Sequence, residues 1–245
     1  MFRTENALIL REVRFRESDR ILTAMTPGLG KVTLAAHGAL SKKSRIAAGT
    51  QQLTWSELTL FEKDGRYSVR EAVTREAFPG LRRELENLAL GSYIAECLEL
   101  FSTEGQPEPE LLQLGLNSLY ALSEGLAPRE KIKAAFELRL TAMEGYAPAV
   151  EVCAVCGRKE IRSPVFLQDD GVAVCRDCLR EERRFLPFTS GALEAMRQVL
   201  QAPPKRFLSF GLDGEDLARL SSVSEAWLLH CAGREIPSLD YYKKL

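Results

Sequence analysis

Four cysteines in two closely spaced pairs form the clearest chemical pattern in the sequence. Cys153 and Cys156 enclose two residues, and after eighteen more residues Cys175 and Cys178 repeat the same spacing. Two Cys-x-x-Cys turns at this separation match a zinc ribbon or a treble-clef site, in which all four thiolates face one ion. Four protein ligands fill a tetrahedron and leave no position open for water or substrate. We therefore expect one zinc ion with a structural role, and no catalytic residues around it.

Two other uses of these cysteines fit the sequence less well. The chain opens Met-Phe-Arg-Thr-Glu-Asn without an apolar signal segment, so we expect a cytoplasmic protein rather than one with disulfides. A redox-active pair would need a single Cys-x-x-Cys at the start of a long helix. The other two cysteines, Cys97 and Cys231, fall in helical patterns, and we expect them to be buried and unreactive.

The segment between the cysteine pairs has the pattern of a β-hairpin. Asp169-Asp170-Gly171 is a turn sequence between the short apolar runs 164–167 and 172–174. The order is then a cysteine turn, a hairpin and a second cysteine turn. We assign residues 151–184 to this zinc-binding module.

The first part of the chain has the pattern of a small β-barrel. Apolar runs at 7–15, 20–26, 31–36, 53–62 and 66–73 are separated by turns, and the alternation in the first slips near Arg11-Glu12, as a bulge would cause. The stretch 38–52 between the third and fourth runs has no strand pattern. This order is typical of a five-stranded OB-fold, which binds single strands, although an SH3-like barrel has as many strands. We place the barrel at residues 1–79.

Beyond residue 80 the apolar spacing becomes helical. We expect helices at 81–101, 110–124, after Pro128 up to Gly145, at 192–200 with Ser190 as the cap, and a last one at 215–231. A short extended piece is expected at 206–210. The predicted fold class is therefore α+β and multidomain: the barrel, then an all-α domain at 80–150 and 185–245, with the zinc module inserted into it.

Charge is distributed unevenly along a chain whose net charge is −1. Residues 1–78 hold 13 Lys and Arg against 9 Asp and Glu, whereas residues 79–150 hold 6 against 11. A basic domain followed by an acidic one suggests that a polyanion binds the first and another partner the second. We expect protein partners on an acidic helical surface that includes Glu84, Glu86, Glu96 and Glu99. No apolar run approaches the length of a membrane span, so no membrane partner is expected.

The basic side chains of the barrel domain are candidates for contact with nucleic acid phosphates. The strands and loops carry, as predicted DNA-binding residues, Arg14, Arg16, Arg20, Lys31, His37, Lys42, Lys43, Arg45, Arg66 and Arg70. Phe15, Trp55 and Tyr67 are aromatic residues that either stack on bases or belong to the barrel core. The sequence Gly28-x-Gly30-Lys31 lacks the spacing of a phosphate-binding P-loop, so no nucleotide cofactor is expected.

Several motifs, in their order along the chain, resemble the bacterial RecO family. They are Arg16-Glu-Ser-Asp19-Arg-Ile21-Leu, Thr26-Pro-Gly28-Leu-Gly30-Lys31, Gly38-Ala39-Leu-Ser-Lys42-Lys43-Ser44-Arg45, Phe136-Glu-Leu138-Arg-Leu140, Gly145-Tyr146-Ala-Pro148, the cysteine pairs and Arg234-Glu-Ile-Pro-Ser238-Leu. The resemblance covers nearly the whole chain and implies an OB-fold, a helical domain and a four-cysteine zinc module. One departure is Thr74-Arg75-Glu76, which replaces the family's usual apolar-acidic junction after the barrel.

The resemblance also implies a function. A protein of this kind is a recombination mediator in DNA repair, present in the bacterial cytoplasm and associated with the nucleoid. It binds single- and double-stranded DNA, anneals complementary strands and, with RecR, loads RecA onto single strands coated by single-strand-binding protein.

Two other function classes are weaker. A zinc-dependent enzyme would need further ligands or bases, but the two histidines, His37 and His230, are not at metal-ligand spacing with a carboxylate. A transcription or translation factor would use its zinc ribbon to touch nucleic acid. The cations near the cysteines keep that alternative open: Arg158, Lys159, Arg162, Arg176, Arg180, Arg183 and Arg184. Mixed with Glu160, Glu181 and Glu182, they also fit a solvated face.

Overall fold

The chain divides into two compact units. The computed structural model describes residues 1–180 and 183–245, with residue 205 described by its backbone alone. One unit comprises Met1–Glu124 with Ile236–Leu245, and the other Gly125–Glu235. The domain boundaries expected at residues 79, 150 and 184 do not coincide with this division. The separation into a barrel, a helical domain and a zinc module therefore stays a prediction.

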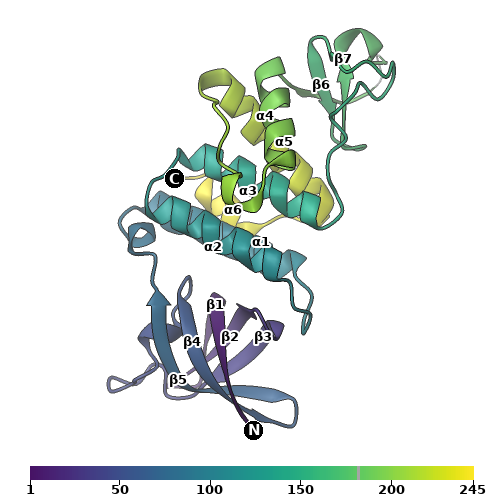
Figure 1. Cartoon of the computed structure of the whole chain (residues 1–245). Coiled ribbons are helices and arrows are strands. Elements are labelled where there is room, and N and C mark those ends of the chain that lie inside the picture. Colours follow the sequence, from purple (N-terminus) through teal and green to yellow (C-terminus); the bar gives the residue numbers. More distant parts are fainter. Residues whose placement is uncertain (181–182) are drawn as a thin grey trace. The chain divides into compact units, whose positions relative to one another are not determined.

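The first unit contains a closed β-barrel, as the apolar pattern predicts (Figure 1). Its strands are β1 (Phe2–Phe15), β2 (Asp19–Thr26), β3 (Gly30–Ala36), β4 (Trp55–Lys63) and β5 (Arg66–Glu76). Their order is β1-β2-β3-β5-β4, and β4 pairs with β1 to close the barrel. All pairs are antiparallel except β3 with β5. This is the strand order of an OB-fold.

Alternating side chains fill the barrel. Along β2, β3 and β4 the inward residues Leu22, Leu34, Leu58 and Leu60 are fully buried. The pairing of β1 with β2 shifts register between Ile9 and Arg11, one residue before the predicted position. Such a bulge bends a strand, which allows one long strand to pair on both sides of a small barrel.

Helices α1, α2 and α6 belong to the same unit as the barrel. The 3-10 turn Pro79–Arg82 leads into α1 (Leu85–Phe101), so the predicted helix at 81 begins four residues late; α2 (Pro109–Ser123) follows. A further helix, α6 (Pro237–Tyr242), was not expected, because Gly233 was interpreted as the end of the last one. The backbone N–H of Ser238 donates to the Glu96 carboxylate at 3.0 Å, which fixes α6 against α1.

The second unit packs α3 (Arg129–Met143), α4 (Ser190–Gln201) and α5 (Gly214–Ala232) together, next to a small sheet of β6 (Pro164–Leu167), β7 (Val172–Cys175) and β8 (Leu186–Pro187). The hairpin β6–β7 turns at the predicted residues. Two expectations are wrong. Thr189 rather than Ser190 caps α4, since its side chain accepts from Ala192 N. No strand forms at 206–210, where the 3-10 turn Pro204–Arg206 ends and a turn follows.

A buried ion cluster joins α3 to α5. Lys133 is 3% exposed and lies 2.8 Å from the carboxylates of both Glu137 and Glu225. The hydroxyl of Ser224 donates to Glu137 at 2.6 Å. Burial acts to lower the pKa of Lys133, but the two carboxylates outweigh it and raise that pKa. Removing the lysine would leave two carboxylates with little solvent, so the cluster depends on all its members.

In the part of the chain that the structure describes, no helix is long and apolar enough to cross a membrane.

Candidate nucleic-acid interface and metal centre

Most of the predicted DNA-binding residues lie exposed on the barrel. Arg14 and Arg16 lie at the β1–β2 turn, and Lys42, Lys43 and Arg45 lie on the irregular segment after β3. We call that segment, residues 38–46, the basic loop. Arg66 and Arg70 lie on β5, and the imidazole of His37 at the end of β3 is 61% exposed. These eight side chains are available to a ligand, although nothing in the structure shows one.

Neighbouring residues at the start of β2 hold the two ends of the basic loop. The Asp19 carboxylate accepts hydrogen bonds from the Gly38 backbone N–H at 2.8 Å and from His37 Nδ1 at 2.9 Å. Hydrogen bonding by Gly38, followed by that of His37, lowers the pKa of Asp19. Arg20 donates from Nη1 to the Ala47 carbonyl oxygen at 3.1 Å and to Thr50 Oγ1 at 3.2 Å. Arg20, which the sequence prediction assigned to DNA, thus holds the chain that directly follows the basic loop.

Aromatic and cationic side chains line a hollow beside the basic loop. The hollow has a volume of about 670 Å³ and is lined by His37, Phe61, Lys63, Arg66, Tyr67 and Arg70 among others; we call it the cationic hollow. The guanidinium of Arg70 lies over the Phe61 ring, 5.0 Å from its centroid. Phe2 contacts the same ring, with centroids 5.1 Å apart. Cations next to exposed rings are the arrangement that binds both phosphates and unpaired bases.

Sequence reasoning missed Lys63, Phe61 and Phe2 at this surface. Lys63 and Phe61 lie at the end of β4, where the turn into β5 brings them beside Arg66, and that turn was visible in the sequence. Of the aromatic candidates, Tyr67 is half-buried and lines the hollow, and Trp55 is half-buried. The alternative that Phe15 belongs to the barrel core is wrong, because it is 46% exposed.

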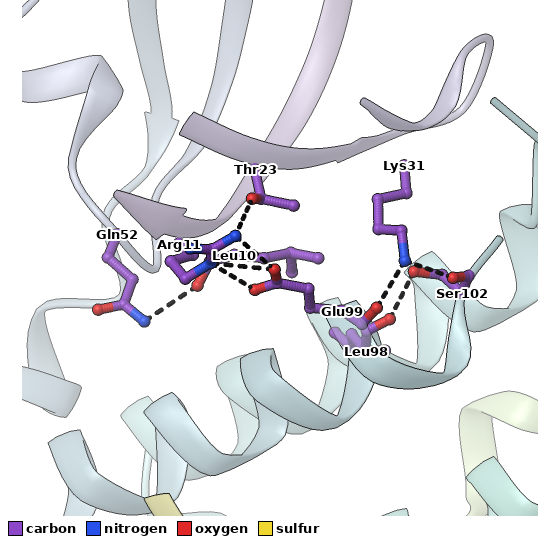
Figure 2. A network of polar contacts seen from close by, with 8 residues as sticks. All are labelled: Leu10, Arg11, Thr23, Lys31, Gln52, Leu98, Glu99 and Ser102. Atoms are coloured by element: carbon purple, nitrogen blue, oxygen red, sulfur yellow. Dashed lines mark hydrogen bonds and ion pairs between the residues drawn. The ribbon is translucent and has the colours of Figure 1, made fainter. Parts of the chain in front are cut away.

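Lys31 has a different partner from the predicted one (Figure 2). Its ammonium donates to the backbone carbonyl oxygens of Glu99 at 2.7 Å and Ser102 at 2.5 Å, at the C-terminal end of α1. The carbonyl groups at that end of a helix lack intrahelical partners and carry partial negative charge, so a lysine there stabilises the helix. Arg11 reinforces the contact by pairing with the Glu99 carboxylate through two hydrogen bonds of 3.0 Å.

A glycine allows the chain after α1 to approach β3. Gly30 has a φ of +65°, and a Cβ there would lie 1.9 Å from the Gln106 carbonyl oxygen. The backbone N–H of Gly105 donates to the Lys31 carbonyl oxygen at 2.9 Å. The motif that contains Gly30 and Lys31 therefore docks the barrel on α1 and its following loop.

The predicted acidic surface on α1 is partly used within the unit. Glu99 pairs with Arg11, and Glu96 accepts from Ser238. Glu86, in the first turn of α1, is half-buried. The four glutamates thus do not form one free acidic patch.

The four cysteines of the second unit meet at one point, as their spacing predicts. The sulfur atoms of Cys153, Cys156, Cys175 and Cys178 all lie within 4.8 Å of one another. Cys153 and Cys175 are buried, Cys156 is exposed and Cys178 is half-buried. Four thiol sulfurs this close together are compatible with a metal site.

Local hydrogen bonds and burial shift the pKa values of Cys153 and Cys178 in opposite directions. Burial acts to raise the pKa of Cys153, but hydrogen bonds from the backbone N–H groups of Cys156, Cys175 and Val155 hold it at about 6. Hydrogen bonding with Cys156, together with burial, raises the pKa of Cys178 to about 12. A bound cation favours the thiolate form of such a set.

Trp227 of α5 and Arg197 of α4 attach the hairpin and the cysteine turns to the helices. Gly171, in the β6–β7 turn, lies against the Trp227 indole of α5, where a Cβ would be 2.4 Å from the ring. The edge of the Phe166 ring meets the same indole at 6.0 Å, and the indole N–H donates to the Tyr146 carbonyl oxygen at 2.9 Å. From α4, Arg197 donates to the carbonyl oxygens of Val150 and Lys159, on either side of the first cysteine pair.

The cations near the cysteines are exposed but not all unpaired. Arg183 forms an ion pair with Asp170, and the guanidinium of Arg176 lies over the Phe185 ring at 4.4 Å. Arg158, Lys159 and Arg162 are exposed. Glu181 and Glu182, expected to share this face, lie outside the described residues.

Comparison with known proteins identifies relatives over the whole chain. The N-terminal domain of recombination protein O matches residues 1–78, and its C-terminal domain matches residues 82–240. A DNA repair protein RecO from Acetivibrio thermocellus is 32% identical over 240 residues, covering 98% of this chain and 96% of the relative. RecO of Desulforudis audaxviator is 32% identical over 247 residues, covering 100% and 97%. RecO of Desulfitobacterium hafniense is 34% identical over 202 residues, covering 80% and 72%. The chain therefore belongs to the RecO family of DNA repair proteins.

Proposed function

We propose that this protein is a recombination mediator without catalytic turnover, which binds single-stranded DNA on its barrel and also binds double-stranded DNA. It anneals complementary strands and, with RecR, promotes loading of RecA onto single strands coated by single-strand-binding protein. The observation that carries the proposal is the basic loop, whose exposed Lys42, Lys43 and Arg45 are held at both ends by Asp19 and Arg20. A loop fixed in place loses less conformational entropy when it binds.

The proposed footprint is smaller than the sequence predicted. It comprises the basic loop, Arg14, Arg16 and the cationic hollow with His37, Arg66 and Arg70. Arg20 and Lys31 are left out because both are engaged within the unit: Arg20 Nη1 donates to the Ala47 carbonyl oxygen and to Thr50 Oγ1, and the Lys31 ammonium donates to two backbone carbonyl oxygens. Electrophoretic binding of labelled oligonucleotides tests the footprint. Substitutions within it should weaken binding to oligonucleotides of every sequence, whereas substitutions at Arg20 or Lys31 should lower the stability of the protein.

We further propose that the four cysteines hold one zinc ion with a structural role. Cys153, Cys156, Cys175 and Cys178 would be its ligands, and it would keep the cysteine turns and hairpin folded. Elemental analysis of the purified protein should give one equivalent of zinc. Absence of any metal, with the cysteines reduced, would contradict this assignment.

For protein partners, we propose that RecR and single-strand-binding protein dock on the helices rather than on the barrel. Acidic residues at the start of the helices, the half-buried Glu86 on α1 and the exposed Glu110 on α2, support this. Charge reversal at both should weaken capture of one partner while leaving oligonucleotide binding unchanged. Unchanged capture of both partners would move the docking surface elsewhere.

A protein that works on exposed single strands should be found with the nucleoid, in the cytoplasm. A fluorescent fusion should gather on the nucleoid after DNA damage, and a uniform distribution would contradict that expectation. Membership of a DNA repair family argues against the alternative of a transcription or translation factor.

A further inference from the structure

A second hollow adjoins the cationic hollow on the barrel. It has a volume of about 570 Å³, and its walls include Ile21, Leu29, Val32, Tyr67, Glu104 and Gly105; we call it the apolar hollow. The two hollows share Ala35, Arg66 and Tyr67 as lining residues. A ligand that lies along the cations of one therefore reaches directly into the other.

The apolar hollow exists because β3 is only partly covered along one edge. Its parallel pairing with β5 joins Leu34 to Tyr67 and Ala35 to Ser68. At the other end of β3, Lys31 forms a parallel bridge with Glu104. Val32 and Thr33 lie between these two points and line the hollow. The contacts of Lys31 with the end of α1 keep the far wall in place (Figure 2).

Most of the lining is apolar, and its charged residues are Glu104, Arg66 and Lys31, whose ammonium already donates to the carbonyl oxygens of Glu99 and Ser102. Ile21, Leu29 and Tyr67 are only partly buried, so each presents apolar surface to the hollow. Glu104 is exposed at the wall, and among residues 1–180 and 183–245 no side chain forms an ion pair with it. The Glu104 carboxylate repels phosphate, so the backbone of a nucleic acid is better placed along Arg66 and the other cations of the cationic hollow. The apolar hollow suits instead a flat, uncharged group that carries hydrogen-bond donors.

We propose that the apolar hollow is a pocket for one unpaired nucleobase of a bound single strand. This inference rests on the proposed function, because the phosphates on either side of that base lie on Arg66 and Arg70 of the cationic hollow. The base stacks on the Tyr67 ring, and the Glu104 carboxylate accepts a hydrogen bond from its exocyclic amino group. Cytosine offers such a donor. Thymine places a carbonyl oxygen at the same position, and two acceptors repel each other.

The pocket therefore gives the protein a base preference. Oligonucleotides of about a dozen nucleotides, all cytosine or all thymine, match the site size of one OB-fold. Fluorescence anisotropy should give about five-fold tighter binding of the cytosine oligonucleotide, as expected for one solvent-accessible hydrogen bond. In Glu104→Gln the amide offers both a donor and an acceptor, so that preference should fall to near unity.

A matched control separates the pocket from general electrostatics. Glu110→Gln removes the same charge from an exposed position at the start of α2, outside the hollow, and should keep the preference. Two results would overturn the base pocket and leave the proposed function standing. One is that Glu104→Gln keeps the preference for cytosine. The other is that the unsubstituted protein binds both oligonucleotides equally. Failure to bind either oligonucleotide overturns both the base pocket and the proposed function.

Discussion

Replacing Lys31 with methionine distinguishes its structural contact from the predicted role in DNA binding. The substitution keeps an apolar side chain of similar length but removes the ammonium that donates to the carbonyl oxygens of Glu99 and Ser102. The C-terminal end of α1 then loses a cation that satisfies two carbonyl groups. The expected result is a less stable first unit with an unchanged interaction with DNA.

The size of the effect follows from these contacts. A hydrogen bond to a charged group contributes about 1.5–3 kcal/mol when it is buried. Lys31 is only half-buried, so we expect the pair to contribute about 2–3 kcal/mol in total. For a unit of this size each kcal/mol changes the melting temperature by about 3–4 °C. Thermal denaturation followed by circular dichroism should therefore show a decrease of about 6–12 °C.

Lys63→Met is the matched control. Lys63 is exposed in the cationic hollow, so its substitution should leave the melting temperature nearly unchanged. It should instead lower the log-log salt dependence of single-strand binding by about 0.7, the value for one phosphate contact. If Lys31→Met lowers the salt dependence and leaves the melting temperature unchanged, the structural account of Lys31 is refuted and the sequence prediction is restored.

Four further predictions concern the loop, the metal, the loop anchor and the buried cluster. Alanine at all three cations of the basic loop should reduce the log-log salt slope by about 2, and an unchanged slope would remove the loop from the footprint. Cys153→Ser should release the metal and free the hairpin from Trp227. In a Trp55→Phe background Trp227 is the remaining tryptophan, so the fluorescence emission should change. A bound metal with unchanged emission would contradict this. The hydrogen bond from Gly38 lowers the pKa of Asp19 in the folded protein from 3.8. This hydrogen bond therefore stabilises the loop above pH 3.8, and the stabilisation is lost as the pH falls through the pKa of the folded protein. The amide resonance of Gly38 should titrate with a midpoint below 3.8, and a midpoint at or above it would contradict the anchor. Lys133→Met should destabilise the second unit by about 3–5 kcal/mol in chemical denaturation, and a neutral effect would show that the carboxylates find other partners.

Local patterns in the sequence were sufficient for the barrel and the metal centre. Strand alternation is set by residues two apart, so the burial of Leu22, Leu34 and Leu58 could be predicted without knowing their partners. The cysteine pairs impose their geometry through two short turns and a hairpin, all of which the sequence shows. The bulge in β1 was also visible, because it breaks the alternation where it occurs.

Long-range partners could not be predicted in this way. Nothing near Lys31 indicates that its ammonium binds carbonyl groups 68 and 71 residues away, or that Arg20 donates to a residue 27 positions later. The sequence around a lysine in a basic domain does not distinguish one that binds phosphate from one that caps the C-terminal end of a helix. These two residues were therefore assigned to DNA by composition alone.

The helices show a similar limit. Apolar spacing predicted α1, α2 and α3 but not that α1 and α2 share a compact unit with the barrel. The short α6 has too few turns for an amphipathic pattern, and Pro237 at its start was the remaining local signal. Thr189 and Ser190 can both cap a helix, so only the backbone geometry could identify Thr189 as the cap.

Binding of single- and double-stranded oligonucleotides at two salt concentrations tests the central claim most directly. The account predicts that the intact protein binds single strands in dilute salt and that its affinity falls linearly on a log-log scale as salt rises, since cations of the barrel release counterions from the phosphates. An intact, folded protein that binds no oligonucleotide in dilute salt, or whose affinity does not depend on salt, would contradict it.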